Sequence, residues 1–97
     1  MLDPRVLKSV AEQVLSGAEV VVDGRTSRVA RTGSGRLRTA RFVVEGMEYQ
    51  AIEQNPDKPS QWGKLAREGH RVVQFRDLST QKYIAVVVDG KVREFGK

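Results

Sequence analysis

The sequence predicts an α+β fold. We expect an antiparallel β-rich sheet or partly closed barrel of six or seven strands, with an N-terminal helix and a short helix after the fourth strand. One amphipathic segment opens the chain, a Val-Val-acid-Gly motif recurs three times, and a proline-rich break separates two groups of apolar segments. At 97 residues the chain is expected to form one domain, 1–97, around one core.

The first expected element is a helix over residues 4–16. Asp3 suits the N-cap, Pro4 suits the first helical position, and Gly17 follows the last helical residue. The apolar residues recur at spacings of four and gather on one side of the helix, which should therefore pack on a sheet. They are Val6, Leu7, Val10, Ala11, Val14 and Leu15.

Residues 19–53 are expected to form a four-stranded antiparallel meander. Its strands are predicted near 19–22, 25–31, 36–45 and 47–53. Hairpin turns are predicted at Asp23-Gly24, Glu45-Gly46 and, later in the chain, Asp89-Gly90. These pairs follow β-branched residues, and type I′ turns require the positive φ that glycine and acidic residues tolerate. A fourth turn at 32–35 joins the second strand to the third.

The second half of the chain begins where two prolines between positions 54 and 60 end the sheet. A short helix over 60–68 is predicted there, because Ser60 can cap its start and Gly69 can end it. Three strands are then expected within 70–95.

The expected core combines one side of the first helix with alternate strand positions. It consists of Val6, Val10, Val14, Val20, Val22, Phe42, Val44, Ile52, Trp62, Leu65, Val73, Phe75, Ile84, Val86 and Val88. Phe42, Tyr49 and Tyr83 are each expected to pack in the core, since sheets bury aromatic side chains routinely.

The positive charge is concentrated in one window of the sequence. The chain has 17 lysines and arginines against 12 aspartates and glutamates, a formal net charge of +5. Between residues 24 and 44 there are six arginines and no acidic residue or lysine, so the rest of the chain is nearly neutral. These candidate nucleic-acid-binding residues are Arg25, Arg28, Arg31, Arg36, Arg38 and Arg41.

The planar guanidinium group of arginine can donate two parallel hydrogen bonds to a phosphate or carboxylate group. The arginines between residues 24 and 44 therefore indicate an anionic partner. We predict a small basic, non-enzymatic nucleic-acid-binding domain. Arg31, Arg36 and Arg38 would ring the end of a two-stranded arm that can enter a groove and contact phosphates. Four strands followed by a helix is also the element order of several single-strand-binding folds, a likeness in element order alone.

Two other interpretations of the arginines remain open. The same hairpin could serve a protein-interaction or regulatory module that binds an acidic protein, or that self-associates through strand edges as a homodimer. The arginines could equally be a solvated face. Arginines that converge beside an exposed Phe42 or Tyr49 would favour nucleic acid, and arginines that diverge would favour a protein partner.

No catalytic residue, metal ligand or cofactor is predicted. The chain has no cysteine and one histidine, His70, which excludes thiolate sites and sites built from several imidazoles. The Gly33-Ser34-Gly35 turn leads into a strand, whereas a phosphate-binding P-loop leads into a helix. Long apolar runs and a signal-like N-terminus are absent from the sequence, so we expect no membrane association and a cytoplasmic location.

Overall fold

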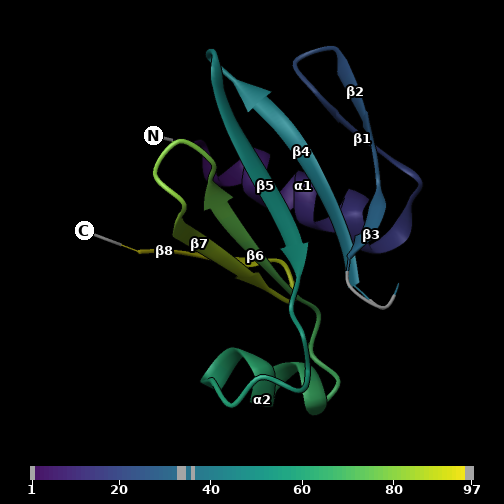
Figure 1. Ribbon diagram of the computed structural model, residues 1–97, viewed down its shortest axis with the longest axis vertical. Coiled ribbons are helices and arrows are strands. Elements are labelled where there is room, and N and C mark those ends of the chain that lie inside the picture. The colour runs from purple at the N-terminus through teal and green to yellow at the C-terminus, as the bar shows by residue number, and fades with distance from the viewer. Residues whose placement is uncertain (1, 33–34, 36, 96–97) are drawn as a thin grey trace.

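The computed structural model describes residues 2–32, 35 and 37–95, and it has an α+β fold, as the sequence predicts (Figure 1). A helix lies behind a bent antiparallel sheet, and a short second helix lies beyond one end of the sheet. The elements are α1 (Pro4–Ser16), β1 (Glu19–Val22), β2 (Arg25–Arg28), β3 (Ala30–Thr32), β4 (Leu37–Val44), β5 (Met47–Glu53), α2 (Gln61–Arg67), β6 (Val72–Asp77), β7 (Lys82–Val88) and β8 (Lys91–Glu94). No helix in this part of the chain has the length and apolar character needed to span a membrane.

The main sheet has six strands in the order β3-β4-β5-β6-β7-β8, so strands adjacent in the sequence are adjacent in space. Its edges are β3 and β8. β1 and β2 pair with each other in a separate two-stranded sheet. The prediction of one continuous four-stranded meander is therefore wrong, because the expected second strand, 25–31, is divided into β2 and β3.

The division falls at Val29, which is half-buried against the core. Its backbone N–H donates to the Ala18 carbonyl at 2.8 Å and completes the β1–β2 hairpin. β3 begins at the next residue, where Ala30 lies opposite Thr39 of β4. Burial of Val29 thus turns the chain between two sheets and lets the hairpin pack beside α1.

One core lies between α1, the β1–β2 hairpin and one face of the main sheet. Phe75 is fully buried there and meets the Phe42 ring edge-on, with 6.0 Å between the ring centroids. Ala40, Ala51 and Ala85 flank Phe75 in a single row across four strands. Three small side chains thus leave room for one large ring, which permits dense packing under the helix.

Much of the predicted core is confirmed. The buried members of this core are Val10, Val14, Val20, Val22, Phe42, Val73 and Phe75, and Val86 is buried on the opposite face of the sheet, where it pairs with Gln74. The members half-buried against this core are Val6, Val44 and Ile84, whereas Ile52, Trp62, Leu65 and Val88 are half-buried outside it. The structure also buries Leu2, Leu7, Ala11, Val72 and Val87 together with the three alanines.

The three acid-glycine turns have the conformation that the sequence predicts. Asp23 and Gly24 have φ values of 51° and 75°, and the other two pairs are within a few degrees of these values. Positive φ at both central residues is the signature of the type I′ turn, whose twist matches that of the flanking strands. The turns therefore fix the register of the β1–β2, β4–β5 and β7–β8 hairpins.

Helix α2 holds the preceding loop, residues 54–60, in place. The Ser60 hydroxyl accepts a hydrogen bond from the Gly63 N–H at 3.1 Å and caps the helix. The Arg67 guanidinium donates to the Pro56 carbonyl at 2.6 Å and to the Lys58 carbonyl at 2.9 Å. A Cβ at Gly63 would lie 2.1 Å from the Lys58 carbonyl oxygen, so the loop approaches the helix as closely as glycine allows.

This close approach predicts whether an alanine at position 63 raises or lowers the free energy of unfolding. In an exposed helix, Gly→Ala stabilises by about 1 kcal/mol through helix propensity. We expect Gly63→Ala instead to lower the free energy of unfolding by about 1–3 kcal/mol, measured by urea denaturation, because the loop must move. The control is Lys64→Ala at the next, exposed position, which should change stability by less than about 0.5 kcal/mol. A Gly63→Ala protein at least as stable as the control would contradict the contact.

Candidate nucleic-acid interface

The structure places the predicted arginines on several surfaces. Arg25 and Arg28 are exposed on β2 and point to opposite sides of the hairpin, since they are three positions apart on a strand. Arg31 is exposed on β3, and its guanidinium donates to the Gly35 carbonyl at 3.2 Å. Arg36 lies outside the described residues, as do residues 33 and 34 of the turn. The described arginines therefore diverge.

The aromatic residues nearest to these arginines in sequence are in the core. Phe42 is 3% exposed and Tyr49 is 8% exposed, and their rings stack with centroids 5.6 Å apart. Core packing of both residues is confirmed. The structure therefore does not provide the arrangement of converging arginines beside one of these rings.

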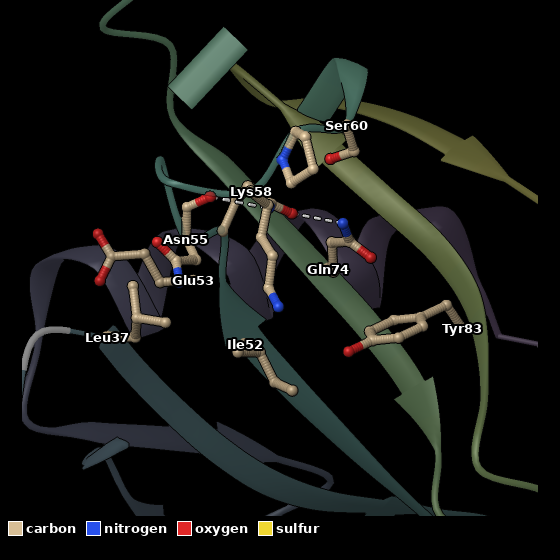
Figure 2. A pocket seen from close by; sticks show the side chains of 10 residues that line it. Leu37, Ile52, Glu53, Asn55, Lys58, Ser60, Gln74 and Tyr83 are labelled. Atoms are coloured by element: carbon tan, nitrogen blue, oxygen red, sulfur yellow. Dashed lines mark hydrogen bonds between the residues drawn. The ribbon is translucent and has the colours of Figure 1, made fainter. Parts of the chain in front are cut away.

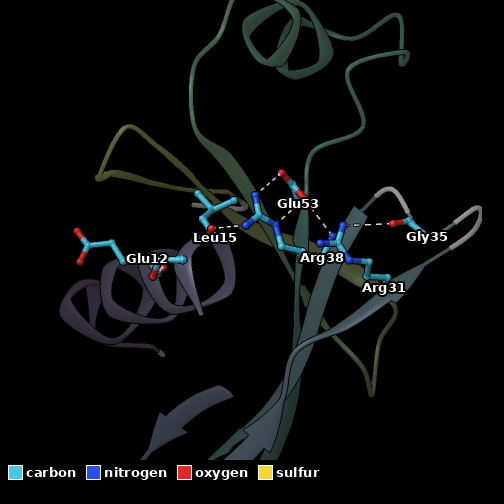
Figure 3. A network of polar contacts seen from close by, with 7 residues as sticks. Glu12, Leu15, Arg31, Gly35, Arg38 and Glu53 are labelled. Atoms are coloured by element: carbon cyan, nitrogen blue, oxygen red, sulfur yellow. Dashed lines mark hydrogen bonds and ion pairs between the residues drawn. The ribbon is translucent and has the colours of Figure 1, made fainter. Parts of the chain in front are cut away.

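Arg38 does not stand on a solvated arm, so this expectation is wrong. It is half-buried, and its guanidinium donates to both carboxylate oxygens of Glu53 at 3.1 and 3.2 Å. A further N–H donates to the carbonyl of Leu15 in the last turn of α1 (Figure 3). Helices leave their last carbonyls without internal partners. Arg38 thus fixes the end of α1 to β4 and β5.

The same contacts determine the charge state of Glu53. Burial by itself would raise the pKa of this carboxyl group. The hydrogen bonds from the side chain and backbone N–H of Arg38 outweigh burial and hold the pKa below its usual value, with help from the positive charge of Arg31. Glu53 is therefore ionised in the folded protein at neutral pH and balances Arg38.

The face of the main sheet opposite α1 carries a different cluster. We call it the open face, and its described side chains include Thr39, Arg41, Gln50, Ile52, Gln74, Arg76 and Tyr83. One row crosses four strands, because Arg41 lies opposite Gln50, Gln50 opposite Arg76, and Arg76 opposite Tyr83. Directly opposed side chains have Cβ atoms about 5 Å apart. The row therefore brings two guanidinium groups and one phenol ring onto a single surface.

Gln50 holds the middle of this row in a fixed orientation. Its amide nitrogen donates to the Thr39 hydroxyl at 3.0 Å, and its carbonyl accepts from the Arg76 guanidinium at 2.7 Å. The Thr39 hydroxyl in turn donates to the Ala51 carbonyl at 2.9 Å. The chain of bonds runs from β4 to β6 and positions the Arg76 fork.

Tyr83 reaches the open face through a register shift. By simple alternation it would share a face with Ala85 and point toward α1. It is expected in the core because sheets bury aromatic side chains routinely. The pairing instead passes from Phe75–Ala85 directly to Arg76–Tyr83, so that Ile84 is an extra residue that packs against the core. Such a bulge re-aims the following side chain. Tyr83 is 48% exposed, and the prediction of its burial is wrong.

Arg76 has hydrogen-bonding capacity that its described neighbours do not fill. Its guanidinium carbon lies 6.0 Å from the centroid of the Tyr83 ring, an ordinary cation–π distance. Its Nε is buried and has no hydrogen-bond partner among the described residues. The Arg76 side chain also makes no ion pair with any of them. Buried donors are nearly always paired in folded proteins. An arginine without an ion pair is suited to an anion such as phosphate, two of whose oxygens can accept from the guanidinium together.

A pocket of about 560 Å³ adjoins the row, between the open face and the 54–60 loop (Figure 2). Its lining consists of Leu37, Ile52, Glu53, Gln54, Asn55, Lys58, Pro59, Ser60, Gln74 and Tyr83. The Lys58 ammonium and the Tyr83 hydroxyl point into the space above Ile52, whereas the Glu53 carboxylate points away. The pocket therefore combines an apolar floor with cationic and neutral polar groups.

One pair of titratable groups outside this surface, His70 and Asp89, has a structural role. His70 Nδ1 lies 2.6 Å from a carboxylate oxygen of Asp89, whose other oxygen accepts the Arg71 N–H at 2.8 Å. These bonds, led by that from Arg71, lower the pKa of Asp89. In the described part of the chain, no three histidine, aspartate or glutamate side chains are close enough together to hold a metal ion.

Sequence reasoning identified Arg41 in this surface and missed Gln50, Lys58, Gln74 and Arg76. Gln50 could have been found, because the Glu45-Gly46 turn fixes it opposite Arg41. Arg76 could not be placed in this way, because β5 and β6 are joined by a loop and α2 and no hairpin turn sets their register.

Comparison with known proteins adds no further assignment. The chain matches no protein-family model, and neither the curated proteins nor the solved structures include a significant match to it.

The Arg38–Glu53 pair predicts a specific pH dependence of stability. The pKa of Glu53 is lower in the folded protein than in the unfolded chain, so its carboxylate stabilises the fold above about pH 4.3. That contribution is lost as the pH falls through the folded-state pKa. We expect the fall in unfolding free energy between about pH 5 and pH 3 to be shallower in Glu53→Gln, measured by urea denaturation at each pH. Glu48→Gln, an exposed glutamate of the same strand, is the matched control. If the unfolding free energy falls equally steeply with pH in the two variants, the Arg38–Glu53 pair does not cause the pH dependence.

Proposed function

We propose that this protein is a non-enzymatic domain that binds single-stranded nucleic acid across the open face of its sheet. The observation that carries the proposal is the row of Arg41, Gln50, Arg76 and Tyr83. A positively charged surface with an exposed aromatic ring is the combination on which single-strand binders rely, because phosphates pair with cations while bases stack on rings. The local excess of arginine in the sequence supports the same partner.

A single strand fits this surface better than a duplex. The faces of paired bases are stacked inside a double helix, whereas an unpaired base can lie against the exposed Tyr83 ring. Arg41 and Arg76 flank Gln50 and are separated by two strand spacings, roughly 10 Å. They can therefore contact different phosphates of one strand while its bases reach toward Tyr83.

The distribution of charge on the open face gives the strand a preferred side. Glu48 lies two positions before Gln50 on β5 and therefore on the same face, where it repels phosphate. Lys58 lies on the other side of the row, above the pocket. The strand should accordingly lie between the row and the 54–60 loop.

Arg25, Arg28 and Arg31 are assigned to other surfaces in this proposal. They are exposed and add to the positive field that attracts a polyanion, but they lie on β2 and β3, outside the four strands of the row. Arg38 is left out of the interface because Glu53 and the end of α1 occupy its donors. Substitution of the hairpin arginines is therefore a control for substitution of the arginines on the open face.

A protein partner is the second candidate function, and one observation favours it. On the outer side of the β1–β2 hairpin, Val21 is 51% exposed and lies opposite Thr26, two positions from the pair of Glu19 and Arg28. An exposed apolar residue with charged neighbours is common at protein interfaces. On this alternative the hairpin, rather than the open face, would bind an acidic protein or a second copy of the chain.

Binding to labelled decanucleotides tests the first proposal. We expect micromolar or tighter binding of single-stranded DNA or RNA by fluorescence anisotropy, and weaker binding of a duplex. With two or three phosphates neutralised, the slope of log K against log salt should be about −1.4 to −2.1. Arg41→Ala and Arg76→Ala should each reduce the magnitude of that slope by about 0.7. Tyr83→Ala should weaken binding by about 1–3 kcal/mol, through lost stacking.

The matched control is the double variant Arg25→Ala, Arg28→Ala, which removes the same kind of charge from the hairpin. It should reduce affinity less than Arg41→Ala and Arg76→Ala together. A larger loss in the hairpin variant would move the interface to the hairpin. Absence of binding at low salt, or equal binding of polyglutamate, would contradict a nucleic-acid function and favour an acidic protein partner.

A further inference from the structure

We infer that the pocket beside the arginine row receives one unstacked base of the bound strand and distinguishes between bases through Gln74. The inference rests on the proposed function and deepens it, because phosphate contacts alone carry no information about sequence. Base recognition requires a space of suitable size, an apolar surface for the ring and fixed polar groups for its edge. The pocket provides each of these.

The size and surface of the pocket suit an aromatic heterocycle. Its volume of about 560 Å³ lies within the range of pockets that hold small organic ligands. Ile52 forms the floor, Leu37 and Pro59 add apolar wall, and the half-exposed Tyr83 ring stands at the side nearest Arg76. A base that leaves the stack can therefore exchange water for apolar contacts on several sides.

The polar groups in the pocket are held by one another. Gln54 is 8% exposed, and its amide nitrogen donates to the Asn55 carbonyl at 3.0 Å. Its carbonyl accepts a hydrogen bond from the amide nitrogen of Gln74 (Figure 2). This bond orients the Gln74 amide, which keeps its carbonyl oxygen and its second N–H for a ligand. An adjacent donor and acceptor is the pattern by which glutamine contacts a base edge.

The loop that covers the pocket is fixed before any ligand binds. Arg67 holds the Pro56 and Lys58 carbonyls, and Gly63 permits the loop to touch α2. The Lys58 side chain consequently extends over the pocket with its ammonium group toward the space above Ile52. A preformed pocket avoids the entropic cost of ordering a loop on binding. Lys58 is placed to pair with the phosphate of the nucleotide whose base enters.

The test uses decamers of A, C, T and an abasic decamer with the same phosphates, each titrated against the whole protein by anisotropy. The wild-type protein should bind its best homopolymer at least about tenfold more tightly than its worst, and about tenfold more tightly than the abasic decamer. Gln74→Met, which has similar length, should reduce the differences among the three bases to within about threefold. Gln61 is an exposed glutamine outside the pocket, so Gln61→Met is the matched control. It should leave the differences in affinity among the three bases unchanged.

The possible failures are distinguishable. Equal affinity of the wild-type protein for all four decamers, with dependence on Arg41 and Arg76 preserved, would overturn the base pocket and leave the proposed function standing. Unchanged base preference in a folded Gln74→Met protein would remove Gln74 from recognition. Absence of binding to every decamer would overturn the proposed function itself.

Discussion

A single 13-residue helix covers one face of a six-stranded sheet, and the rest of the structure depends on this asymmetry. The helix and the β1–β2 hairpin supply enough apolar surface to bury the face that carries Phe42 and Phe75. On the opposite face Val72 and Val86 are buried at one end, whereas across β4, β5 and β6 the described side chains include Arg41, Gln50 and Arg76. The hydrophobic effect therefore separates the chain into a face that holds the fold together and a face that is free to bind.

The end of β5 joins these two faces. Glu53 points toward α1 and pairs with Arg38, while its neighbours Ile52 and Gln54 belong to the pocket on the other side. The same residues lead into the loop that α2 holds through Arg67. Contacts that stabilise the helix layer thus also position one side of the pocket, and α2 positions the loop on the other side.

The sequence predicts the local elements of this fold well and the long-range arrangement less well. Caps and type I′ turns are set by residues a few positions apart, so the first helix and the acid-glycine hairpins could be derived. The division of the second strand at Val29 depends on burial against a core that is distant in sequence. The exposure of Tyr83 depends on a bulge in its pairing with Arg76, which no local pattern reveals. The arginine window marked Arg41, and the Glu45-Gly46 turn places Gln50 opposite it, but Arg76 comes from β6, whose register with β5 is not set by a hairpin turn.

The most direct test of the account is a ¹H–¹⁵N NMR titration of the protein with a single-stranded decamer. We expect chemical-shift changes at the side-chain amides of Gln50 and Gln74 and at the backbone of Tyr83, with β1 and β2 little affected. Perturbation concentrated on the β1–β2 hairpin, or none at all with a decamer that binds by anisotropy, would contradict the assignment of function to the open face.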